Sequence, residues 1–383
     1  MRWNVIAKNN PIFIGLLGGL LTACLLDEKE CKMLDCSKEI RKFHDEEVTL
    51  QSAQQNEMRE RRNSNRDRLK SGLKNNGKPS PIYLRSQGSY AMRTMVQDAE
   101  NDYDIDDGMY FKQEDLKTSQ GNDMSALSVR NMICDIIQDE RFNNKPEVKN
   151  NCVRVYYNDG SHIDVPAYRI IIEKDFLGNE TENFELASSD WKASDPRKVT
   201  DWLRDTAKDK SPDDDPDQFR RIVRLLKAFS KSRSGWKTDK GASGFTITKL
   251  TQEVFVAASG RDDESLHKTM KAIKQRLDLN LSVYHPVIHG EKLAKNDDVR
   301  TRRFKERLEQ NLEHLNVMDN PECTPEQALK AWGKVFNNTD FFDARIQERK
   351  SANNAIGSMA IIKEAERLNL NSPVNKQGNN EYA

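Results

Sequence analysis

The sequence predicts an α+β fold with a helical lobe in its C-terminal half, on three observations. First, short segments with strand periodicity alternate with helical segments in the first half of the chain. Second, residues 153–157 and 162–172 flank an Asn-Asp-Gly-Ser turn, which is the signature of a β-hairpin. Third, the apolar spacing becomes helical past about residue 188, and 383 residues are enough for two lobes with a core each.

The first half starts with a charged, glycine-poor stretch over residues 37–76, which predicts a long outer helix. Ser52 and Gln55 have the spacing of a capping box at its start. The Gly-Lys-Pro-Ser-Pro sequence after it ends the helix. The remaining elements of this half are strands at 82–85 and 103–111, one or two helical turns at 90–96 and a helix at 125–138.

The second half contains a series of amphipathic segments. The Asp-Pro pair at 195–196 opens one helix, and further helices are expected at 219–231, 250–258, 266–277, 299–315 and 324–335. Residues 369–383 are polar and rich in Asn, so we expect them to be disordered. The predicted division is an N-terminal extension over 1–32, an α+β domain over 33–190, a helical lobe over 191–350 and a C-terminal segment with a flexible tail over 351–383.

Composition excludes several classes of protein. Lys plus Arg and Asp plus Glu both number 61, whereas proteins that bind duplex nucleic acid usually carry a basic excess, so any binding of polyanions must be local. The six cysteines form no C-x-x-C pair and no Cys/His cluster with zinc spacing. We interpret them as reduced thiols of a cytoplasmic protein.

The N-terminus leaves two interpretations open. Arg2 and Lys8 precede an apolar run at 12–21, and a Leu-Thr-Ala-Cys sequence ends at Cys24, as in a bacterial lipoprotein signal. In this case the protein is anchored to a membrane through a lipidated Cys24. Alternatively, translation starts at Met33 and the protein is cytoplasmic, which we favour because the chemistry predicted below needs intracellular nucleotides.

Carboxylates are crowded on the strand expected at 103–111. Since alternate residues of a strand share a face, Asp104 and Asp106 point one way, and Ile105 and Asp107 point the other. Two such charges about 4 Å apart repel by roughly 4 kcal/mol at an effective dielectric constant near 20, so a cation is needed to compensate them. Asp164, between apolar neighbours on the hairpin, is a third carboxylate, and oxygen ligands of this kind suit Mg²⁺. A paired carboxylate in the core is the alternative for Asp164.

Two further features suit a phosphate-bearing substrate. A Gly88-Ser89 turn between a strand and a short helix brings backbone N–H groups and a hydroxyl close to a phosphate. The helix at 219–231 carries a cationic stripe, which is usually a solvated face; Lys227 lies nearest to its apolar boundary and is best placed to reach inward. Each of these motifs is weak evidence alone. Their order along the chain, a Gly-Ser turn, then two aspartates on the next strand and a third on a later strand, strengthens the interpretation.

These blocks together resemble the nucleotidyltransferase superfamily with a polymerase-β-type palm. More narrowly, they resemble the DncV-like relatives of cyclic GMP-AMP synthase, which make cyclic oligonucleotides in bacterial antiphage signalling. The blocks that carry the resemblance are Gln87-Gly88-Ser89-Tyr90, the D-I-D-D-G-M-Y segment from Asp104, the H-I-D-V-P-A-Y segment from His162, W-K-A-S-D-P at 191–196, R-L-L-K-A-F at 224–229 and G-A-S at 241–243.

The resemblance implies a catalytic domain over 33–190 that joins ATP or GTP into a cyclic di- or trinucleotide. It implies that Asp104, Asp106 and Asp164 are catalytic and hold two Mg²⁺ ions. It also implies nucleotide contacts, with Gln87, Gly88, Ser89 and Tyr90 at the donor, Lys227 at the triphosphate and Ser243 as a secondary contact, although Gly244 replaces a second serine found in relatives.

The resemblance also concerns partners. Related synthases act through a downstream effector that binds the cyclic nucleotide, and some are joined at their C-terminus to targets by a ubiquitin-like conjugation system. Ala383 would be the acceptor, and a plain disordered tail is the alternative. The Cys/His zinc insertion of animal DNA sensors is absent, so double-stranded DNA is not expected as a partner.

Two other functions remain open at this point. One is a transferase that adds nucleotides to RNA or another acceptor, which a long basic tract would favour. The other is a non-catalytic protein that binds nucleotides or is tethered to a membrane, which loss of one of the three acids would favour. Other enzyme classes lack their motifs, since the sequence has no G-x-x-x-x-G-K-[ST] and no H-E-x-x-H.

Overall fold

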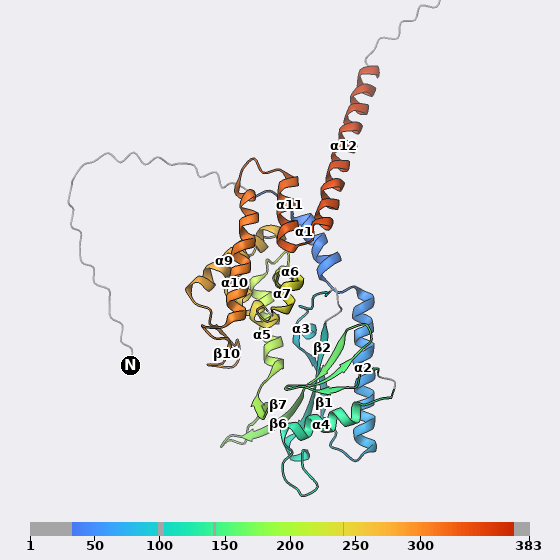
Figure 1. Ribbon diagram of the computed structural model, residues 1–383, viewed down its shortest axis with the longest axis vertical. Helices are drawn as coiled ribbons and strands as arrows, with labels where there is room; N and C mark the ends of the chain where they lie inside the picture. Colours follow the sequence, from blue (N-terminus) through green and yellow to red (C-terminus); the bar gives the residue numbers. More distant parts are fainter. Residues whose placement is uncertain (1–32, 99–102, 141–142, 240, 371–383) are drawn as a thin grey trace, which may run out of the picture. The chain divides into compact units, whose positions relative to one another are not determined.

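The computed structural model describes residues 33–98, 103–140, 143–239 and 241–370. Over these ranges a mixed β-sheet with flanking helices is followed by a helical region, which confirms the predicted α+β fold (Figure 1). The interpretations placed on Cys24 and Ala383 lie outside the described residues. Within the described ranges, no helix combines the length and the apolar character that a membrane span requires.

The sheet is built around strand β2, Asp104–Lys112. This strand pairs antiparallel with β1, and parallel first with β5 and then with β6. The strand order is β3-β4-β5-β2-β6-β7-β8, with β1 attached to β2. The other strands are β1 Tyr83–Gln87, β3 Glu147–Val148, β4 Val153–Tyr156, β5 His162–Val165, β6 Ala167–Lys174, β7 Glu180–Ala187 and β8 Trp191–Ala193.

The predicted hairpin is present, because β4 and β5 pair antiparallel around the turn at Gly160. The strand expected over 162–172 is divided in two at Pro166, which has no N–H to donate to the sheet. The register against β2 is the same on both sides of this proline. Asp104 therefore lies opposite His162 on β5, and Asp106 lies opposite Asp164.

Helices α2, Ser52–Asn75, and α4, Ala126–Ile137, pack on one face of the sheet (Figure 1). Between them and the sheet lies a core that includes Leu69, Leu73, Ile105, Val129, Ile133, Val155 and Ile163. The predicted capping box of α2 is wrong by one residue. Gln51 is the N-cap, its N–H donates to the Gln54 side chain, and Ser52 is already the first helical residue.

The stretch over 37–51 is not part of α2. It forms α1, Ser37–Phe43, and then a single π-helical turn, His44–Val48, before the chain extends into the cap of α2. Phe43 from α1 contacts Phe336, Phe341 and Phe342 near the C-terminal end of the chain. The N-terminal part of the described chain thus belongs to the core of the helical region.

The helical region has α6, Gln218–Lys231, at its centre, in contact with α8, α9 and α11. Its core includes Ile222, Leu226, Phe229, Phe304 and Trp332. The other helices are α5 Pro196–Lys210, α7 Ser234–Thr238, α8 Gly244–Val254, α9 Asp262–Leu279, α10 Val299–Leu315, α11 Pro325–Phe336 and α12 Thr339–Leu370, and β9 Val283–Tyr284 pairs with β10 Lys292–Ala294.

Two elements of this region differ from the prediction. α8 begins at Gly244 and not at 250, because the Ser243 hydroxyl accepts a hydrogen bond from the N–H of Thr246 and caps the helix there. α12 extends to Leu370, through a stretch for which no helix was predicted, and its apolar residues Ile356, Met359 and Ile361 are exposed.

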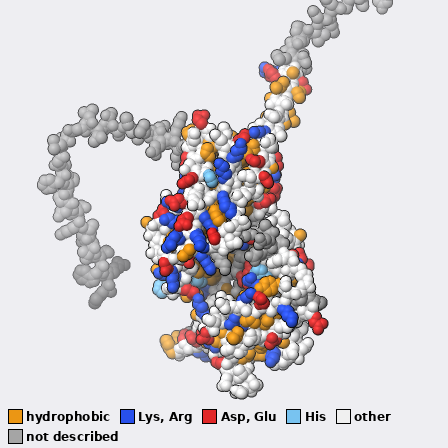
Figure 2. All heavy atoms as spheres, viewed as in Figure 1, with side chains coloured by type: hydrophobic (Ala, Val, Ile, Leu, Met, Phe, Trp, Pro, Cys, Tyr) orange, Lys and Arg blue, Asp and Glu red, His pale blue; other side chains and the backbone are white. Residues whose placement is uncertain are grey.

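Charged side chains of both signs are mixed over the surface in view (Figure 2). This agrees with equal numbers of acidic and basic residues in the whole chain. A site for a phosphate-bearing ligand must therefore be formed locally, by particular side chains.

Candidate active site

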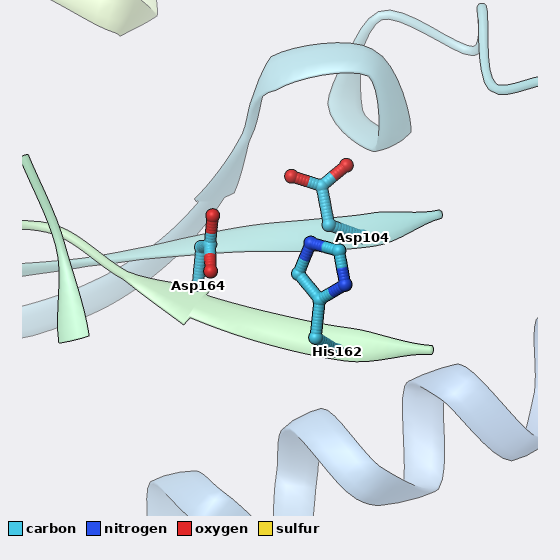
Figure 3. Close-up of side chains that lie close together, drawn as sticks. All are labelled: Asp104, His162 and Asp164. Atoms are coloured by element: carbon cyan, nitrogen blue, oxygen red, sulfur yellow. The ribbon is translucent and has the colours of Figure 1, made fainter. Parts of the chain in front are cut away.

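The carboxylates of the candidate site come from neighbouring strands. In the sheet register, Asp104 lies opposite His162, and Asp106 lies opposite Asp164 on one side and Gln87 on the other. Asp104, His162 and Asp164 each offer a ligand atom, and these atoms lie within 4.8 Å of one another (Figure 3). Two carboxylates and an imidazole are ordinary ligands of divalent cations, so these residues fit a metal ion.

Asp106 stands beside this group and against the Gly88 turn. Helix α3, Gly88–Ala91, follows β1 directly, and Gly88 has φ +63°. A Cβ atom at Gly88 would lie 1.9 Å from Oδ2 of Asp106. Glycine is required here both for the left-handed backbone and for the close approach of the turn to the carboxylate.

The surroundings of Asp104 and Asp106 disfavour the ionised form of both carboxylates. Burial, together with the neighbouring carboxylate of Asp164, raises the pKa of Asp104. Burial and the carboxylates of Asp104 and Asp164 raise the pKa of Asp106 well above its ordinary value. A bound divalent cation would reverse both shifts, since it stabilises the ionised form of each carboxylate.

Asp164 has a cationic partner of its own. Arg154, opposite it on β4, donates from Nε to Oδ1 and from Nη2 to Oδ2, both at 2.8 Å. This fork-shaped pair fixes the plane of the carboxylate. Arg154 could not be predicted as a partner from the sequence, because the pairing depends on the register between β4 and β5.

Asp107 points to the other face of β2, as strand parity predicts. It is 2% exposed and lies within the α2 side of the sheet. Arg66 of α2 donates to it from Nε at 2.6 Å, and Ser86 donates at 3.1 Å. Asp107 is thus a paired structural carboxylate.

A cavity of about 200 Å³ opens beside Asp104, and its walls include Ser89, Thr94, Asp104, Lys227 and Lys231. Lys227 on α6 is buried, and its Nζ donates to the carbonyl oxygen and the hydroxyl of Thr94, each at 3.0 Å. Burial, followed by the charges of Lys231 and Arg224, lowers the pKa of Lys227 to about 7. An anion in this cavity would meet an ammonium group that lacks a charged partner within hydrogen-bonding distance among the described residues.

The other predicted nucleotide contacts are arranged differently. Gln87 is buried in the sheet, where it donates to the Tyr168 hydroxyl at 2.8 Å and accepts from the Tyr110 hydroxyl at 3.3 Å. Gly108 makes room for this arrangement, because a Cβ there would lie 2.7 Å from Gln87 Oε1. The Ser243 hydroxyl is engaged in capping α8, although its neighbours Ala242 and Gly244 line the cavity.

Tyr90 does not line the cavity that Ser89 lines. It lines a separate hollow of about 470 Å³ together with Arg93 and Arg224, and the Arg62 guanidinium lies 5.6 Å from the centre of its ring. Met95 lines both this hollow and the cavity beside Asp104. The stacking role assigned to Tyr90 stays a prediction.

His162 has a side chain of a metal-ligand type, and no role was predicted for it from the sequence. The signal for it was present, since His162 and Asp164 are two residues apart on one strand and so share a face. The register that places His162 opposite Asp104 completes the argument.

Comparison with known proteins shows which family and fold this chain resembles. Residues 83–168 match the sequence model of the nucleotidyltransferase domain of the DncV-like cyclic GMP-AMP synthases. A cyclic GMP-AMP synthase of Escherichia albertii is 26% identical over 223 residues, which is 55% of this chain and 46% of the relative. The match thus spans about half the length of this curated relative.

Solved structures show the same fold. The Vibrio cholerae DncV cyclic AMP-GMP synthase, in complex with the linear intermediate pppA(3′,5′)pG, aligns with a TM-score of 0.62 and 18% identity over 80% of this chain and 97% of its own. Escherichia coli DncV in its 3′-deoxy GTP bound form aligns with a TM-score of 0.58 and 20% identity over 77% and 94%. The resemblance found in the sequence is confirmed: residues 83–168 are a DncV-like nucleotidyltransferase domain, in a chain that has the DncV fold.

Proposed function

We propose that the protein is a Mg²⁺-dependent synthase that joins ATP, GTP or both into a cyclic di- or trinucleotide messenger. The observation that carries this proposal is the meeting of Asp104 and Asp164 from neighbouring strands, with Asp106 placed against the Gly88 turn. It is supported by the family match over the segment that contains all of these residues.

The chain's own residues account for binding and orientation. Asp104, Asp106 and Asp164 would hold two Mg²⁺ ions, which when bound neutralise phosphate charge and align the attacking hydroxyl with the leaving pyrophosphate. The α3 turn would present Ser89 and backbone N–H groups to the donor phosphates. Lys227 would supply positive charge to the triphosphate from the far wall of the cavity.

The size of the cavity limits which part of a nucleotide it can hold. Its volume of about 200 Å³ is below the roughly 300–1,000 Å³ of typical ligand pockets, so it suits the phosphates rather than a whole nucleotide. The base and ribose would then extend outside it, and the acceptor hydroxyl would approach from the open side. Successive transfers at one site, two for a dinucleotide or three for a trinucleotide, would close the ring, which is in keeping with the linear intermediate bound by V. cholerae DncV.

The biological setting belongs to the same proposal. A cytoplasmic role in antiphage signalling, a downstream effector for the product and conjugation of Ala383 all depend on the family likeness. Intact-mass analysis of the protein from its native host would test the conjugation, because an adduct at Ala383 changes the mass of the chain.

The activity is tested with the purified full chain, Mg²⁺ and each labelled nucleoside triphosphate. We expect a product that resists phosphatase, because a cyclic nucleotide has no terminal phosphate. Asp104→Asn and Asp164→Asn should abolish it, with Asp107→Asn as the control from the opposite face of β2. Failure to make any product from every nucleotide pair, or a labelled RNA end instead, would overturn the proposal.

A further inference from the structure

We infer that His162 binds the divalent cation directly, so that the site has a mixed nitrogen and oxygen ligand set and favours Mn²⁺ over Mg²⁺. This inference rests on the proposed function, which places a cation between Asp104 and Asp164. It adds a residue to that site and changes the metal ion expected to be the most effective.

The geometry is the first support. His162 and Asp164 project from the same face of β5, and His162 lies opposite Asp104 in the sheet register. The three ligand atoms lie within 4.8 Å of one another. Around an ion with bonds of about 2.1 Å, opposite ligands are roughly 4.2 Å apart and adjacent ligands roughly 3.0 Å apart, so the side chains need to close by no more than about 2 Å.

The surroundings are the second support. His162 is 5% exposed and Asp164 is 5% exposed, so the imidazole is held among groups that are largely removed from bulk water. Figure 3 shows its ring on the same side of the strands as the two carboxylates. The imidazole is thus placed where it could contribute a nitrogen ligand to an ion held by Asp104 and Asp164.

The chemistry of the ligands then decides the metal. Mg²⁺ prefers oxygen ligands and retains its waters, and it gains little from an imidazole. Mn²⁺ accepts carboxylate oxygens equally well and binds imidazole nitrogen more strongly than Mg²⁺ does. A site with three oxygen ligands would show a smaller preference, so part of the selectivity for Mn²⁺ should be lost with His162.

The test uses the full-length protein labelled with ¹⁵N-histidine, loaded with Mn²⁺ alone and examined by pulsed electron paramagnetic resonance. We expect nuclear coupling from one directly bound histidine nitrogen in the wild type and in His289→Asn, whose histidine is exposed in the loop between β9 and β10. In His162→Asn, whose amide keeps a polar group of similar size, the coupling should disappear.

Affinity gives a second, quantitative reading. His162→Asn should weaken Mn²⁺ binding by about tenfold or more, the scale at which ligand-shell changes act. Mg²⁺ binding, measured by competition, should weaken by less than about threefold, because it gains little from the imidazole. Equal losses for both ions would show that His162 supports the fold of the site without binding the metal.

The outcomes separate this inference from the proposed function. If Mn²⁺ binds the wild type without histidine coupling, the inference is overturned and the carboxylate site stands. If the wild type does not bind Mn²⁺, and Asp164→Asn gives the same result, the carboxylates form no metal site and the proposed function itself fails. A folded His162→Asn variant is verified by a thermal midpoint close to that of His289→Asn.

Discussion

The two faces of strand β2 present aspartates in opposite states of charge compensation. On the α2 face, Asp107 is paired with Arg66 and accepts a hydrogen bond from Ser86. On the other face, Asp104 and Asp106 are close to Asp164, and burial and mutual repulsion raise the pKa of both. Adjacent residues of one strand thus differ, since the protein stabilises the ionised form of Asp107 with an arginine and disfavours the ionised form of Asp106.

The comparison shows that one face of β2 carries a carboxylate that stabilises the fold, and that the other carries the carboxylates of the candidate site. A carboxylate that is neutralised within the protein contributes to stability at neutral pH, whereas uncompensated carboxylates oppose it. Crowded acids are retained on the second face because a cation is expected to bind there. Substitutions on the two faces should therefore change activity and stability in different, and partly opposite, directions.

The largest expected difference concerns activity. Asp104→Asn should reduce nucleotide transfer by at least about a thousandfold, because it would remove a proposed ligand of the metal ions that stabilise the transition state. Asp107→Asn should retain activity within about tenfold of the wild type, because its carboxylate points to α2 and its loss acts through stability. Reaction rates of the folded variants at saturating nucleotide and metal test this difference. Equal inactivation by both variants would show that the two faces of β2 do not differ in function.

A second pair of variants distinguishes the close approach of Gly88 to Asp106 from the backbone strain that any left-handed glycine position imposes on alanine. Gly88→Ala should lower activity by about a hundredfold, because its Cβ would displace the Asp106 carboxylate and small displacements of reacting groups have effects of this size. Gly77→Ala is the matched control, since Gly77 has φ +61° and no atom within 4 Å of the added Cβ. Both variants carry about 1–2 kcal/mol of left-handed strain.

Activity and the thermal midpoint are measured for both glycine variants. The Gly77→Ala variant should lose stability and keep its turnover. If Gly88→Ala were as active as Gly77→Ala, the contact between the α3 turn and Asp106 would have no role in the reaction.

The third effect concerns Lys227, the lysine that lines the cavity beside Asp104. The pKa of Lys227 is about 7 before substrate binds, and a triphosphate would raise it. Below pH 7 the ammonium is already charged, so affinity is highest there. Above pH 7 binding requires proton uptake, and the apparent Kd for ATP should rise by up to about tenfold per pH unit.

Lys227→Met should bind ATP more weakly at pH 7 and show no such slope between pH 7 and 9. Calorimetry in two buffers of different ionisation enthalpy measures the proton uptake directly. A slope that persists in the variant would assign the titration to another group.

The sequence predicted the parity of β2 because it depends only on alternation within one strand, and the structure places Asp107 accordingly. Residues whose partners lie on other strands were harder to find. Arg154 meets Asp164, and His162 meets Asp104, through the register of β5 against its neighbours. The sequence shows that His162 and Asp164 share a face of one strand. Only the register against β2 shows that His162 also lies opposite Asp104.

Elements with weak periodicity were missed as well. β7 has alternating but mostly polar residues and was not predicted, and α12 continues where its side chains are exposed. Tyr90 and Ser89 are adjacent in the sequence, yet they line different hollows because α3 turns between them. Helical phase over a single turn cannot be read from residue types alone.

A fourth effect concerns stability without metal. The pKa of Asp106 is raised in the folded state, so the unfolded chain ionises first and the free energy of unfolding falls as pH rises above about 3.8. Asp106→Asn removes this penalty and should raise the thermal midpoint at pH 7 in the presence of a chelator. Each 1 kcal/mol gained corresponds to roughly 2–4 °C for domains of about this size.

The control for this effect is Asp107→Asn, which should lower the midpoint because it leaves Arg66 without its charged partner. Adding Mg²⁺ or Mn²⁺ should raise the midpoint of the wild type more than that of Asp106→Asn. A lower midpoint for Asp106→Asn in chelator would show that the carboxylate is already compensated in the folded protein.

The smallest expected effect lies wholly on the α2 face. Arg66→Lys keeps the positive charge beside Asp107 but loses the planar fork that meets both carboxylate oxygens, so stability should fall by about 1 kcal/mol. Activity at saturating substrate should stay within about twofold of the wild type, since the carboxylates of the open face are unchanged. A large loss of turnover in a folded Arg66→Lys variant would mean that the two faces of β2 are coupled through the strand, because a shift of Asp107 would then move Asp106 and Asp104 relative to Asp164.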